Sequence, residues 1–378
     1  MKKILITGGA GFIGSNLSLK LLSRGYQVRV FDNLSSQIHG TSPDVTSPLF
    51  ISIKDKVEFF KGDILNKKKL EEALSGQDAV IHLAAETGTG QSMYEIKRYC
   101  DVNVGGTALL LDILTNQKHT IQKIIVASSR AIYGEGKYEC NEHGVVYPDE
   151  RKEIDMRNGD FECKCPVCNQ EVILLPTCEE SKIHPSSIYG ISKQNQEQMT
   201  LTIGKAIGIP AVAFRYQNVY GPGQSLSNAY TGILSIFSTL ILNGQDINIF
   251  EDGRESRDFI YIDDVVDATI SGLETEKANN LTFNIGTGVS VDVNSVAGLL
   301  LKNYSGQGKS RITGNYRIGD IRHNLADISL AKKMLKFKPF FSFNEGIENF
   351  TSWVKMQTIT SSDYERSFKE MQLKGLLK

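Results

Sequence analysis

The chain has 378 residues, of which 40% are hydrophobic and 22% charged, a composition that is ordinary for a folded globular protein and excludes a disordered tail or linker. Its 42 basic and 43 acidic residues leave a formal net charge of -1, so no overall field favours nucleic acid or an anionic membrane as a partner. No apolar run approaches the roughly 20 residues of a transmembrane helix, and no small-residue cleavage site follows the apolar N-terminal run. We therefore expect a cytoplasmic protein.

Strand-like and helix-like runs alternate along the first third of the chain. The predicted strands are residues 3–7, 27–31, 57–61, 79–83 and 123–127, and the predicted helices are residues 16–24, 67–74 and 104–116. This alternation is typical of βα units that build a doubly wound parallel sheet with helices on both faces, as in the Rossmann-type α/β fold. We assign residues 1–214 to this domain.

A glycine-rich turn follows the first predicted strand. The run TGGAGFIG places Gly8, Gly11 and Gly14 between that strand and the next helix, where glycines permit a tight turn and let the backbone approach a pyrophosphate. Asp32 ends the second strand, at the spacing where a carboxylate accepts hydrogen bonds from a ribose. Because an acid there repels a 2′-phosphate, the pattern indicates NAD rather than NADP. The alternative is a glycine-rich turn without a ligand.

Two further strands end at the same edge of the predicted sheet, where ligands bind in such folds. Asp63 follows one of them; it suits the edge of an adenine, but it could instead cap the next helix. Leu83, Ala84 and Ala85 end the other strand and suit a close-packed wall.

Candidate acid–base groups also meet at this edge. Ser128 and Ser129 follow the strand at residues 123–127, while Tyr189 and Lys193, in the run YGISK, share one face of a predicted helix. A lysine beside a phenol stabilises the phenolate, and a serine hydroxyl can share the substrate proton. Tyrosine and lysine at this spacing are common on surface helices, so the prediction depends on all of these groups together.

The regular pattern stops at an insertion, about 137–185, which we interpret as a small fold of its own. It carries two pairs of metal-ligating residues, Cys140 with His143 and Cys165 with Cys168. Their separation is close to that of zinc-ribbon knuckles, and in a reducing compartment such clustering indicates a structural Zn site rather than disulfides. Cys163 and Cys178 could substitute in the set, and free thiols in a loop are the alternative.

A strand at residues 212–216 resumes the pattern after the insertion, and helices are predicted at residues 230–242 and 293–302. We assign residues 215–378 to a smaller α/β domain that binds the substrate. Its end, from about residue 355, carries no recognisable motif.

The chain is similar, over roughly residues 1–350 apart from the insertion, to the extended short-chain dehydrogenase/reductases that act on nucleotide sugars. The motifs that carry this resemblance, in chain order, are TGGAGFIG, Asp32, GDI, HLAA, Asn103, SSRAIYG, YGISK, RYQNVYGP, RDFIYIDD, NIGTG and GDIRH. The resemblance implies a catalytic triad of Ser129, Tyr189 and Lys193, with Ser128 as the fallback for the serine.

The resemblance also implies two sets of binding residues. The NAD-binding residues would be Gly8, Gly11, Phe12, Ile13, Asp32, Asn33, Asp63, Ile64, Leu83, Ala84, Ala85, Asn103, Ser128, Tyr189, Lys193 and Tyr216. The substrate-binding residues would be Thr87, Thr89, Gln91, Ser129, Asn218, Arg257 and Arg322. The two arginines would hold the diphosphate, for which guanidinium geometry is suited, although each could instead make an ordinary surface ion pair, and residues 86–91 could equally be a solvated loop.

The residue after the catalytic serine bears on the reaction. Family members that dehydrate or decarboxylate use an acid there, whereas Arg130 follows Ser129 in this chain. The resemblance therefore implies a 4-epimerase, in which Tyr189 takes the C4 hydroxyl proton and the hydride passes to NAD and returns from NADH to the other face of a transient 4-keto sugar.

A narrower resemblance concerns the substrate. The run HLAAETGTGQSMYE and the cysteine-bearing insertion look most like dTDP-L-rhamnose 4-epimerases, so a dTDP-sugar is the favoured nucleotide-sugar partner. The alternatives are a 2-epimerase, dehydratase or reductase of the same family, or a non-catalytic protein that binds NAD and a nucleotide sugar. The resemblance also suggests a homodimer through helices at residues 104–116 and 189–205.

Overall fold

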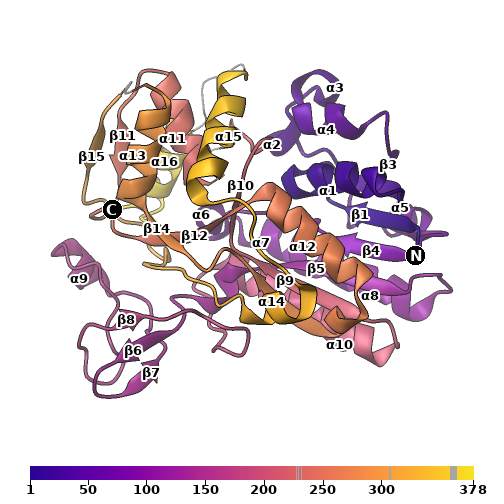
Figure 1. Ribbon diagram of the computed structural model, residues 1–378, viewed down its shortest axis with the longest axis horizontal. Helices are drawn as coiled ribbons and strands as arrows, with labels where there is room; N and C mark the ends of the chain where they lie inside the picture. Colours follow the sequence, from indigo (N-terminus) through magenta and orange to yellow (C-terminus); the bar gives the residue numbers. More distant parts are fainter. Residues whose placement is uncertain (227, 229, 231, 306–307, 358–363) are drawn as a thin grey trace.

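The centre of the protein is a sheet of seven parallel strands (Figure 1), in the order β13-β9-β5-β4-β1-β2-β3. The computed structural model describes residues 1–378 apart from 227, 229, 231, 306–307 and 358–363. The strands are β1 Lys3–Thr7, β2 Gln27–Asp32, β3 Glu58–Lys61, β4 Ala79–His82, β5 Lys123–Ser129, β9 Ala211–Tyr216 and β13 Leu281–Ile285. The prediction of an α/β fold around a parallel sheet is confirmed.

Side chains on both faces of this sheet are buried. In β1, Ile4 and Ile6 pack into one core and Leu5 into another, because successive strand residues point to opposite faces. The first core is covered by α1 (Phe12–Ser23) and α12 (Ile262–Glu274), and the second by α5 (Lys67–Leu74), α8 (Gly106–Asn116) and α10 (Ile188–Ala206). Burial of both faces explains why the strands read as nearly continuous apolar runs.

The strand order reverses between β1 and β4, which are hydrogen-bonded neighbours although two strands separate them in the chain. In open α/β sheets the crevice at such a reversal, outside the carboxyl ends of the strands, is where ligands bind. The glycine turn after Thr7 and the run at residues 83–85 both lie at this point.

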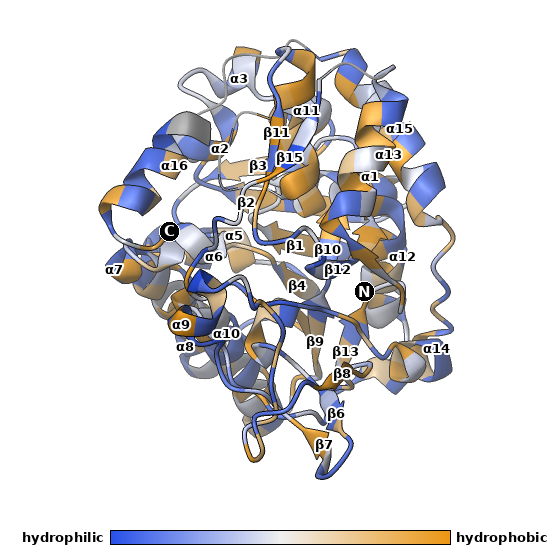
Figure 2. Ribbon diagram, turned by 90° about the vertical axis from the view of Figure 1, so that its left-hand side faces the viewer, coloured by the Kyte–Doolittle hydropathy of each residue, from blue (hydrophilic) through white to orange (hydrophobic). Residues whose placement is uncertain are grey.

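A smaller layer of helices and short sheets lies beside the carboxyl edge of the main sheet. Its sheets have the orders β10-β12-β14 and β11-β15. The strands are β10 Asn218–Tyr220, β11 Ile247–Ile249, β12 Ser256–Tyr261, β14 Ser290–Asp292 and β15 Ser310–Ile312, and the helices are α11 Ile233–Leu242, α13 Val293–Asn303, α15 Phe343–Lys355 and α16 Tyr364–Leu373. Helix α14 (Ser329–Leu335) instead packs against β13 of the main sheet and against α12. Helix α11 is mainly hydrophobic (Figure 2) and largely buried. Strand β13 belongs to the segment assigned to the substrate domain, yet it forms an edge of the main sheet.

The insertion projects to the lower left in Figure 1 as a separate lobe. It contains a three-stranded sheet of order β7-β6-β8 and one short helix. These elements are β6 Tyr138–Cys140, β7 Gly144–Val146, α9 Glu153–Arg157 and β8 Ile173–Leu174. Its apolar cluster is small and includes three cysteines, so the lobe has little hydrophobic core of its own.

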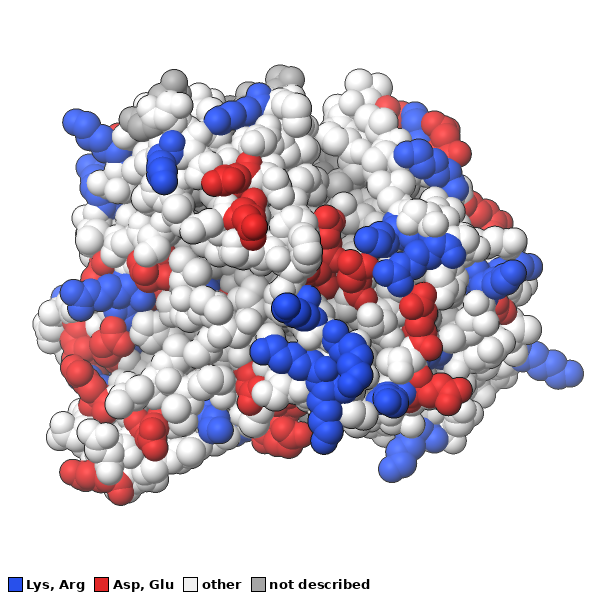
Figure 3. All heavy atoms as spheres, viewed as in Figure 1, with Lys and Arg blue, Asp and Glu red and all other residues white. Residues whose placement is uncertain are grey.

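The remaining described helices are short. They are α2 Ser36–His39, α3 Pro43–Thr46, α4 Pro48–Ile53, α6 Thr89–Ser92 and α7 Ile96–Tyr99, together with a π-helical segment Cys100–Gly105 and 3-10 segments Arg130–Tyr133 and Glu276–Ala278. None of the helices in the described part of the chain is both long and apolar enough to cross a membrane. Acidic and basic side chains are mixed over the face shown in Figure 3, as the net charge predicts.

Candidate active site

One cavity of about 610 Å³ follows the carboxyl edge of the main sheet and continues into the smaller layer. The glycine turn lies at one end, Ser129, Tyr189 and Lys193 lie along its length, and Arg257 lies on the side of the smaller layer. The cavity therefore brings the predicted cofactor, catalytic and substrate groups into one continuous space.

The glycine turn leaves room for a ligand at the start of α1. Gly8 has a φ of 67°, and a Cβ there would lie 2.7 Å from the Ala84 backbone nitrogen, so a side chain is excluded. A Cβ at Gly11 would meet only the Gly8 carbonyl, at 3.3 Å, and Gly11 lines the cavity. No side chain caps α1 and no acid lies in its first turn, which leaves the N–H groups of a helix N-terminus for an anion.

Asp32 lies where the second strand meets the cavity. Its Oδ2 accepts a hydrogen bond from the Ala10 N–H at 3.0 Å, and its Oδ1 accepts one from the Leu34 N–H at 2.8 Å. Burial raises the pKa of this carboxyl group, while these bonds and the nearby His39 oppose the rise. The carboxylate is thus held rigidly with oxygen lone pairs left for another donor.

Several polar atoms along the cavity are buried without a hydrogen-bond partner: Ser128 Oγ, Asn218 Oδ1 and Gln224 Oε1. Buried polar groups are normally paired, so such atoms in a cavity wall indicate a ligand that supplies the partner. Together with the open helix N-terminus and the carboxylate of Asp32, they fit a dinucleotide.

Asn103 does not line the cavity, but it fixes two elements that do. Its Oδ1 accepts from the Glu86 N–H at 2.7 Å, and its Nδ2 donates to the Glu86 carbonyl at 3.1 Å and to Ser192 Oγ at 2.9 Å. The residue is fully buried in the π-helical segment, a local geometry that is frequent near functional sites. Asn103 therefore joins the loop after β4 to the catalytic helix.

The catalytic helix α10 begins beside the end of β5. Tyr189 donates its backbone N–H to Ser92 Oγ at 3.0 Å, and its ring lines the cavity with Ser129 and Lys193. Burial raises the pKa of Tyr189, whereas a hydrogen bond with Ser129 and the charge of Arg130 lower it. The structure thus brings the three predicted catalytic side chains together.

Lys193 is buried and held by one neighbour. Its Nζ donates to Gln196 Oε1 at 2.7 Å, while Gln196 Nε2 donates to Thr107 Oγ1 at 2.8 Å. Burial lowers the pKa of Lys193 to about 7. His82 closes this network between Thr7 and Thr107, and burial lowers its pKa to about 3, so it stays neutral.

Three arginines line the cavity: Arg130, Arg257 and Arg317. Arg257 donates to the carbonyls of Ser256, Arg322 and Ile321, which fixes its guanidinium in the wall. Arg317 stacks over the Phe250 ring, 4.8 Å from its centre, and its buried Nε has no partner. Burial lowers the pKa of Arg130 to about 10, with a further lowering by Arg257, while Asp320 and Glu135 oppose the shift.

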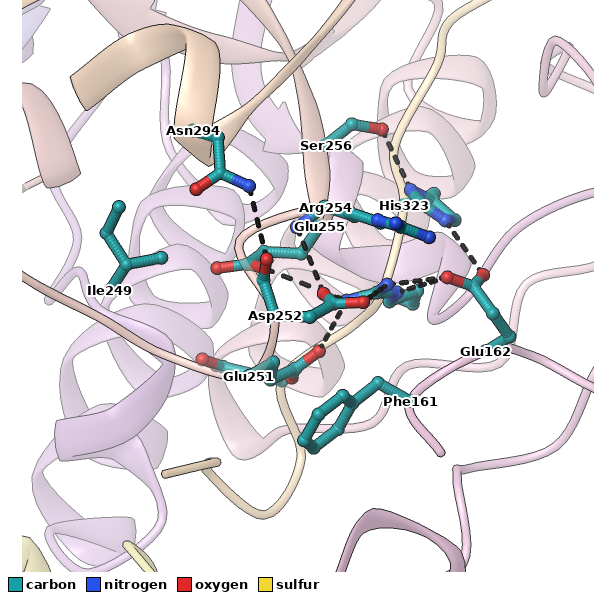
Figure 4. A network of polar contacts seen from close by, with 12 residues as sticks. Phe161, Glu162, Ile249, Glu251, Asp252, Arg254, Glu255, Ser256, Asn294 and His323 are labelled. Carbon is teal, nitrogen blue, oxygen red and sulfur yellow. Dashed lines mark hydrogen bonds and ion pairs between the residues drawn. The ribbon is translucent and has the colours of Figure 1, made fainter. Parts of the chain in front are cut away.

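Arg322 does not reach the cavity, contrary to the expectation that it would hold a diphosphate with Arg257. It is 0% exposed, and its guanidinium donates to Glu162, Glu251 and Asp252 at distances of 2.5 to 3.1 Å. Figure 4 shows these carboxylates gathered together, with His323 between Ser256 and Glu162. Each guanidinium nitrogen of Arg322 already donates to a protein carboxylate. Arg322 therefore links the insertion to the smaller layer instead.

The other predicted binding residues fall into two groups. Those that line the cavity are Phe12, Ile13, Asn33, Ile64, Leu83, Ala84, Ala85, Thr87, Thr89, Tyr216 and Asn218. Asp63 and Gln91 do not. Asp63 accepts hydrogen bonds from Asn33 Nδ2 and from the Leu65 N–H, and Gln91 is 4% exposed and bonded to Tyr99 and Gln37.

In the insertion, the structure groups the four predicted metal ligands, whose ligand atoms lie within 4.8 Å of one another: Cys140, His143, Cys165 and Cys168. Cys140 Sγ is 3.5 Å from His143 Nδ1 and 3.6 Å from Cys168 Sγ. Cys178 lies apart and contacts Ser181 Oγ at 3.4 Å, and Cys163 lies beside Glu135 and Tyr138. The cluster therefore consists of the two predicted pairs and includes neither Cys163 nor Cys178.

The sequence matches the NAD dependent epimerase/dehydratase family over residues 4–150 and 169–286. The chain belongs to this family. The match leaves out residues 151–168, which fall within the predicted insertion.

Curated and solved relatives of the family cover nearly the whole chain. A dTDP-L-rhamnose 4-epimerase from Burkholderia thailandensis is 36% identical over 361 residues, which span 94% of this chain and 96% of that protein. The structure of a UDP-glucose 4-epimerase from Thermotoga maritima with UDP-glucose is 30% identical, with a TM-score of 0.74, and covers 93% of this chain and 98% of its own. A UDP-glucuronic acid 4-epimerase from Bacillus cereus, in complex with UDP-glucuronic acid and NAD, is 27% identical, with a TM-score of 0.76 and coverage of 93% and 99%.

Sequence reasoning missed several residues of this family member. Arg317 lies five residues before Arg322 in the same irregular segment, and the spacing gives no indication of which guanidinium faces the cavity. In the sequence, Arg130 is informative only because it follows Ser129, where family members that dehydrate have an acid. Gln196 lies one turn after Lys193 on α10, a spacing that could have identified it as a hydrogen-bond partner.

Proposed function

We propose that the chain catalyses the NAD-dependent epimerisation of a nucleotide sugar at C4, with dTDP-L-rhamnose as the first candidate substrate. The observation that carries the proposal is the cavity in which Tyr189, Ser129 and Lys193 meet beside three arginines, with Arg130 where a dehydratase would need an acid. The dTDP-sugar is favoured because the relative with 36% identity is a dTDP-L-rhamnose 4-epimerase. A dehydratase or decarboxylase would need an acidic group next to Ser129, and the side chain there is a cation.

The residues of the chain divide the chemistry as follows. Tyr189 takes the proton of the C4 hydroxyl, and Ser129, which bonds to the phenol, shares that proton and orients the hydroxyl. Arg130 lowers the pKa of Tyr189 by its positive charge, and Lys193, one turn further along the same helix, would add a second positive charge that stabilises the phenolate. The guanidiniums of Arg257 and Arg317 hold the diphosphate, so that the anomeric end of the sugar is anchored while its C4 end reacts.

NAD would be held by the N-terminus of α1 and by Asp32, and when bound it would accept a hydride from C4 and return it to the other face of the ring. Ser128 Oγ and Tyr216 line the cavity where the nicotinamide would lie. Asn103 keeps the loop after β4 and the catalytic helix in register, and acts as a positioning residue. Asp63, which lies outside the cavity, would support the adenine side through Asn33.

The test is incubation of the purified protein with dTDP-, UDP-, GDP- and CDP-sugars while the C4 proton is followed by NMR. We expect a C4 epimer from dTDP-L-rhamnose without added NAD, because a retained cofactor is regenerated in each cycle. Loss of water, loss of carbon dioxide or net formation of NADH would instead establish one of the other chemistries of the family.

We also propose a structural zinc ion at Cys140, His143, Cys165 and Cys168. Three thiolates and one imidazole, arranged as two pairs, close a tetrahedral site and can stabilise a lobe whose apolar core is small. Metal analysis should find about one zinc per chain, and Cys168→Ser should reduce it while the matched variant Cys178→Ser leaves it unchanged. Protein that is folded and active yet free of metal after expression with zinc would contradict this site.

Two further proposals concern organisation. Residues 1–214 bind NAD and residues 215–378 bind the nucleotide sugar, although β13 and α12 return to the main sheet. The chain forms a homodimer through α8 and α10, where Ile191 is 43% exposed. Sedimentation of the wild type and of Ile191→Glu tests this, and an unchanged sedimentation coefficient in the variant would contradict the proposed interface.

A further inference from the structure

The C-terminal segment forms part of the cavity wall, although its sequence carries no motif. It consists of α16 and the residues that follow it to Lys378. Helix α16 is largely hydrophilic (Figure 2), yet Met371 on it is 4% exposed and lines the cavity. A buried methionine on a polar helix requires a specific environment, which three sets of contacts define.

The first set joins the end of the chain to the segment that carries Arg317. The Tyr316 N–H donates to the Lys378 carbonyl at 2.9 Å, and the Lys378 N–H donates to the Tyr316 carbonyl at 3.0 Å. The Ile318 N–H donates to the Leu376 carbonyl at 3.0 Å. Arg317 is therefore held between two residues whose backbones pair with the C-terminal segment.

The second set joins α16 to two tyrosines. Glu370 Oε2 accepts a hydrogen bond from Tyr230 OH at 2.9 Å and one from Tyr94 OH at 3.2 Å, and the two hydroxyls lie 2.6 Å apart. Tyr230 itself lines the cavity. Glu370 thus fixes the rotation of α16, and with it the direction of the neighbouring Met371.

The third set places Met371 between α6 and the segment that carries Arg317. A Cβ at Gly90 would lie 3.3 Å from Met371 Sδ, so the thioether packs against α6. The next residues of α6 include Ser92, whose Oγ accepts the backbone N–H of Tyr189. On its other side Met371 shares a small secondary cavity with Arg317 and Leu376.

We propose that Met371 is a specificity-determining residue that provides an apolar wall for the C6 methyl group of a 6-deoxyhexose. This inference rests on the proposed function, because a hexose with its C4 hydroxyl at Tyr189 and its diphosphate at Arg317 must place its ring between these two residues. A thioether side chain packs well against a methyl group. It offers no hydrogen-bond partner to a C6 hydroxyl or carboxylate, which would be desolvated without compensation.

The experiment compares dTDP-L-rhamnose with dTDP-L-mannose, which differ only by a C6 hydroxyl, in the full-length wild type and in two variants. Met371→Gln replaces the thioether by an amide of similar length. The matched control is Leu373→Gln, because Leu373 lies on the same helix and is 88% exposed. The wild type should prefer dTDP-L-rhamnose by roughly tenfold to hundredfold in kcat/KM.

In Met371→Gln this preference should shrink at least severalfold, mainly through a higher KM for dTDP-L-rhamnose, with bound NAD and thermal midpoint close to those of Leu373→Gln. Equal losses for both sugars, or no difference from Leu373→Gln, would overturn the role of Met371 while the proposed function stands. If the wild type epimerises another nucleotide sugar, the choice of dTDP-L-rhamnose fails, and the 6-deoxy and 6-hydroxy forms of that sugar test the wall. A wild type that prefers the 6-hydroxy form overturns it.

Discussion

The cofactor side and the substrate side of the cavity are built in different ways. On the cofactor side, each functional group follows the strand that positions it by a few residues: the glycine turn follows β1, Asp32 ends β2, and Ser129 ends β5. On the substrate side, the wall is assembled from segments far apart in the chain, such as those that carry Arg130, Arg317 and Met371. The groups on the cofactor side therefore appear as short sequence motifs, whereas the wall on the substrate side depends on long-range packing that a motif does not encode.

The largest expected effect is on the side that local motifs define. Tyr189→Phe removes the acid–base hydroxyl and should lower kcat by about 10²- to 10⁴-fold, while the ring and the NAD site remain. The C4 epimer followed by NMR gives the rate, and the absorbance of released cofactor shows whether NAD is retained. A variant with wild-type rates would show that the phenol is not the base.

The next prediction compares substitutions of Arg322 and Arg317, whose different roles the motif alone does not reveal. Arg322→Met removes one of the two arginine partners of the buried Glu251, whose carboxylate keeps its hydrogen bonds from Arg151. It should lower the free energy of unfolding by about 3 kcal/mol, the lower end of the range for breaking a buried pair, because Glu251 stays paired and Glu162 and Asp252 are partly exposed. Arg317→Met should leave stability almost unchanged and raise KM for the nucleotide sugar at least tenfold.

Denaturant titration and initial rates measured on both variants test this contrast. If Arg322→Met raised KM with no loss of stability, the guanidinium would reach the substrate despite its complete burial here. If Arg317→Met unfolded the protein instead, the difference between the two sides of the cavity would be reversed.

Much of the fold could be predicted from the sequence because the main sheet follows periodic rules. The boundaries predicted for 3–7 and 67–74 coincide with β1 and α5, and the seven parallel strands confirm the fold class. The return of β13 to the sheet could not be predicted, because its short apolar run fits an edge strand of either layer. Met371 lies on a helix whose composition is mostly polar, so only the tertiary contacts identify it.

A third prediction concerns Gln196, which accepts the hydrogen bond of Lys193. Gln196→Leu removes the acceptor of Lys193 and should lower kcat about tenfold with little change in KM, because loss of a hydrogen bond to a charged group is worth about 1.5 kcal/mol. Gln196→Glu supplies a charged acceptor, which raises the pKa of Lys193.

The pH profile distinguishes positioning from a merely structural role. Lys193 stabilises the phenolate only while protonated, so the alkaline limb of kcat should move to higher pH in Gln196→Glu and to lower pH in Gln196→Leu. Equal profiles in both variants, with rates that follow stability alone, would contradict the positioning role.

The smallest expected effect is a pH dependence of stability on the substrate side. Burial raises the pKa of Glu255 to about 7, with a further rise from Glu251. Since this value exceeds the ordinary 4.5, the folded state binds more protons between pH 4.5 and 7, and its stability falls as pH rises through that window. Glu255→Gln cannot lose a proton, so its stability relative to the wild type should increase from pH 5 to pH 8, by on the order of 1 kcal/mol.

Thermal midpoints at both pH values measure this gain, and Glu348→Gln, at an exposed position of α15, should show none. A gain that is the same at pH 5 and pH 8 would mean that Glu255 is already ionised at the lower pH, and that its carboxylate is paired on the substrate side as securely as Asp32 is on the cofactor side.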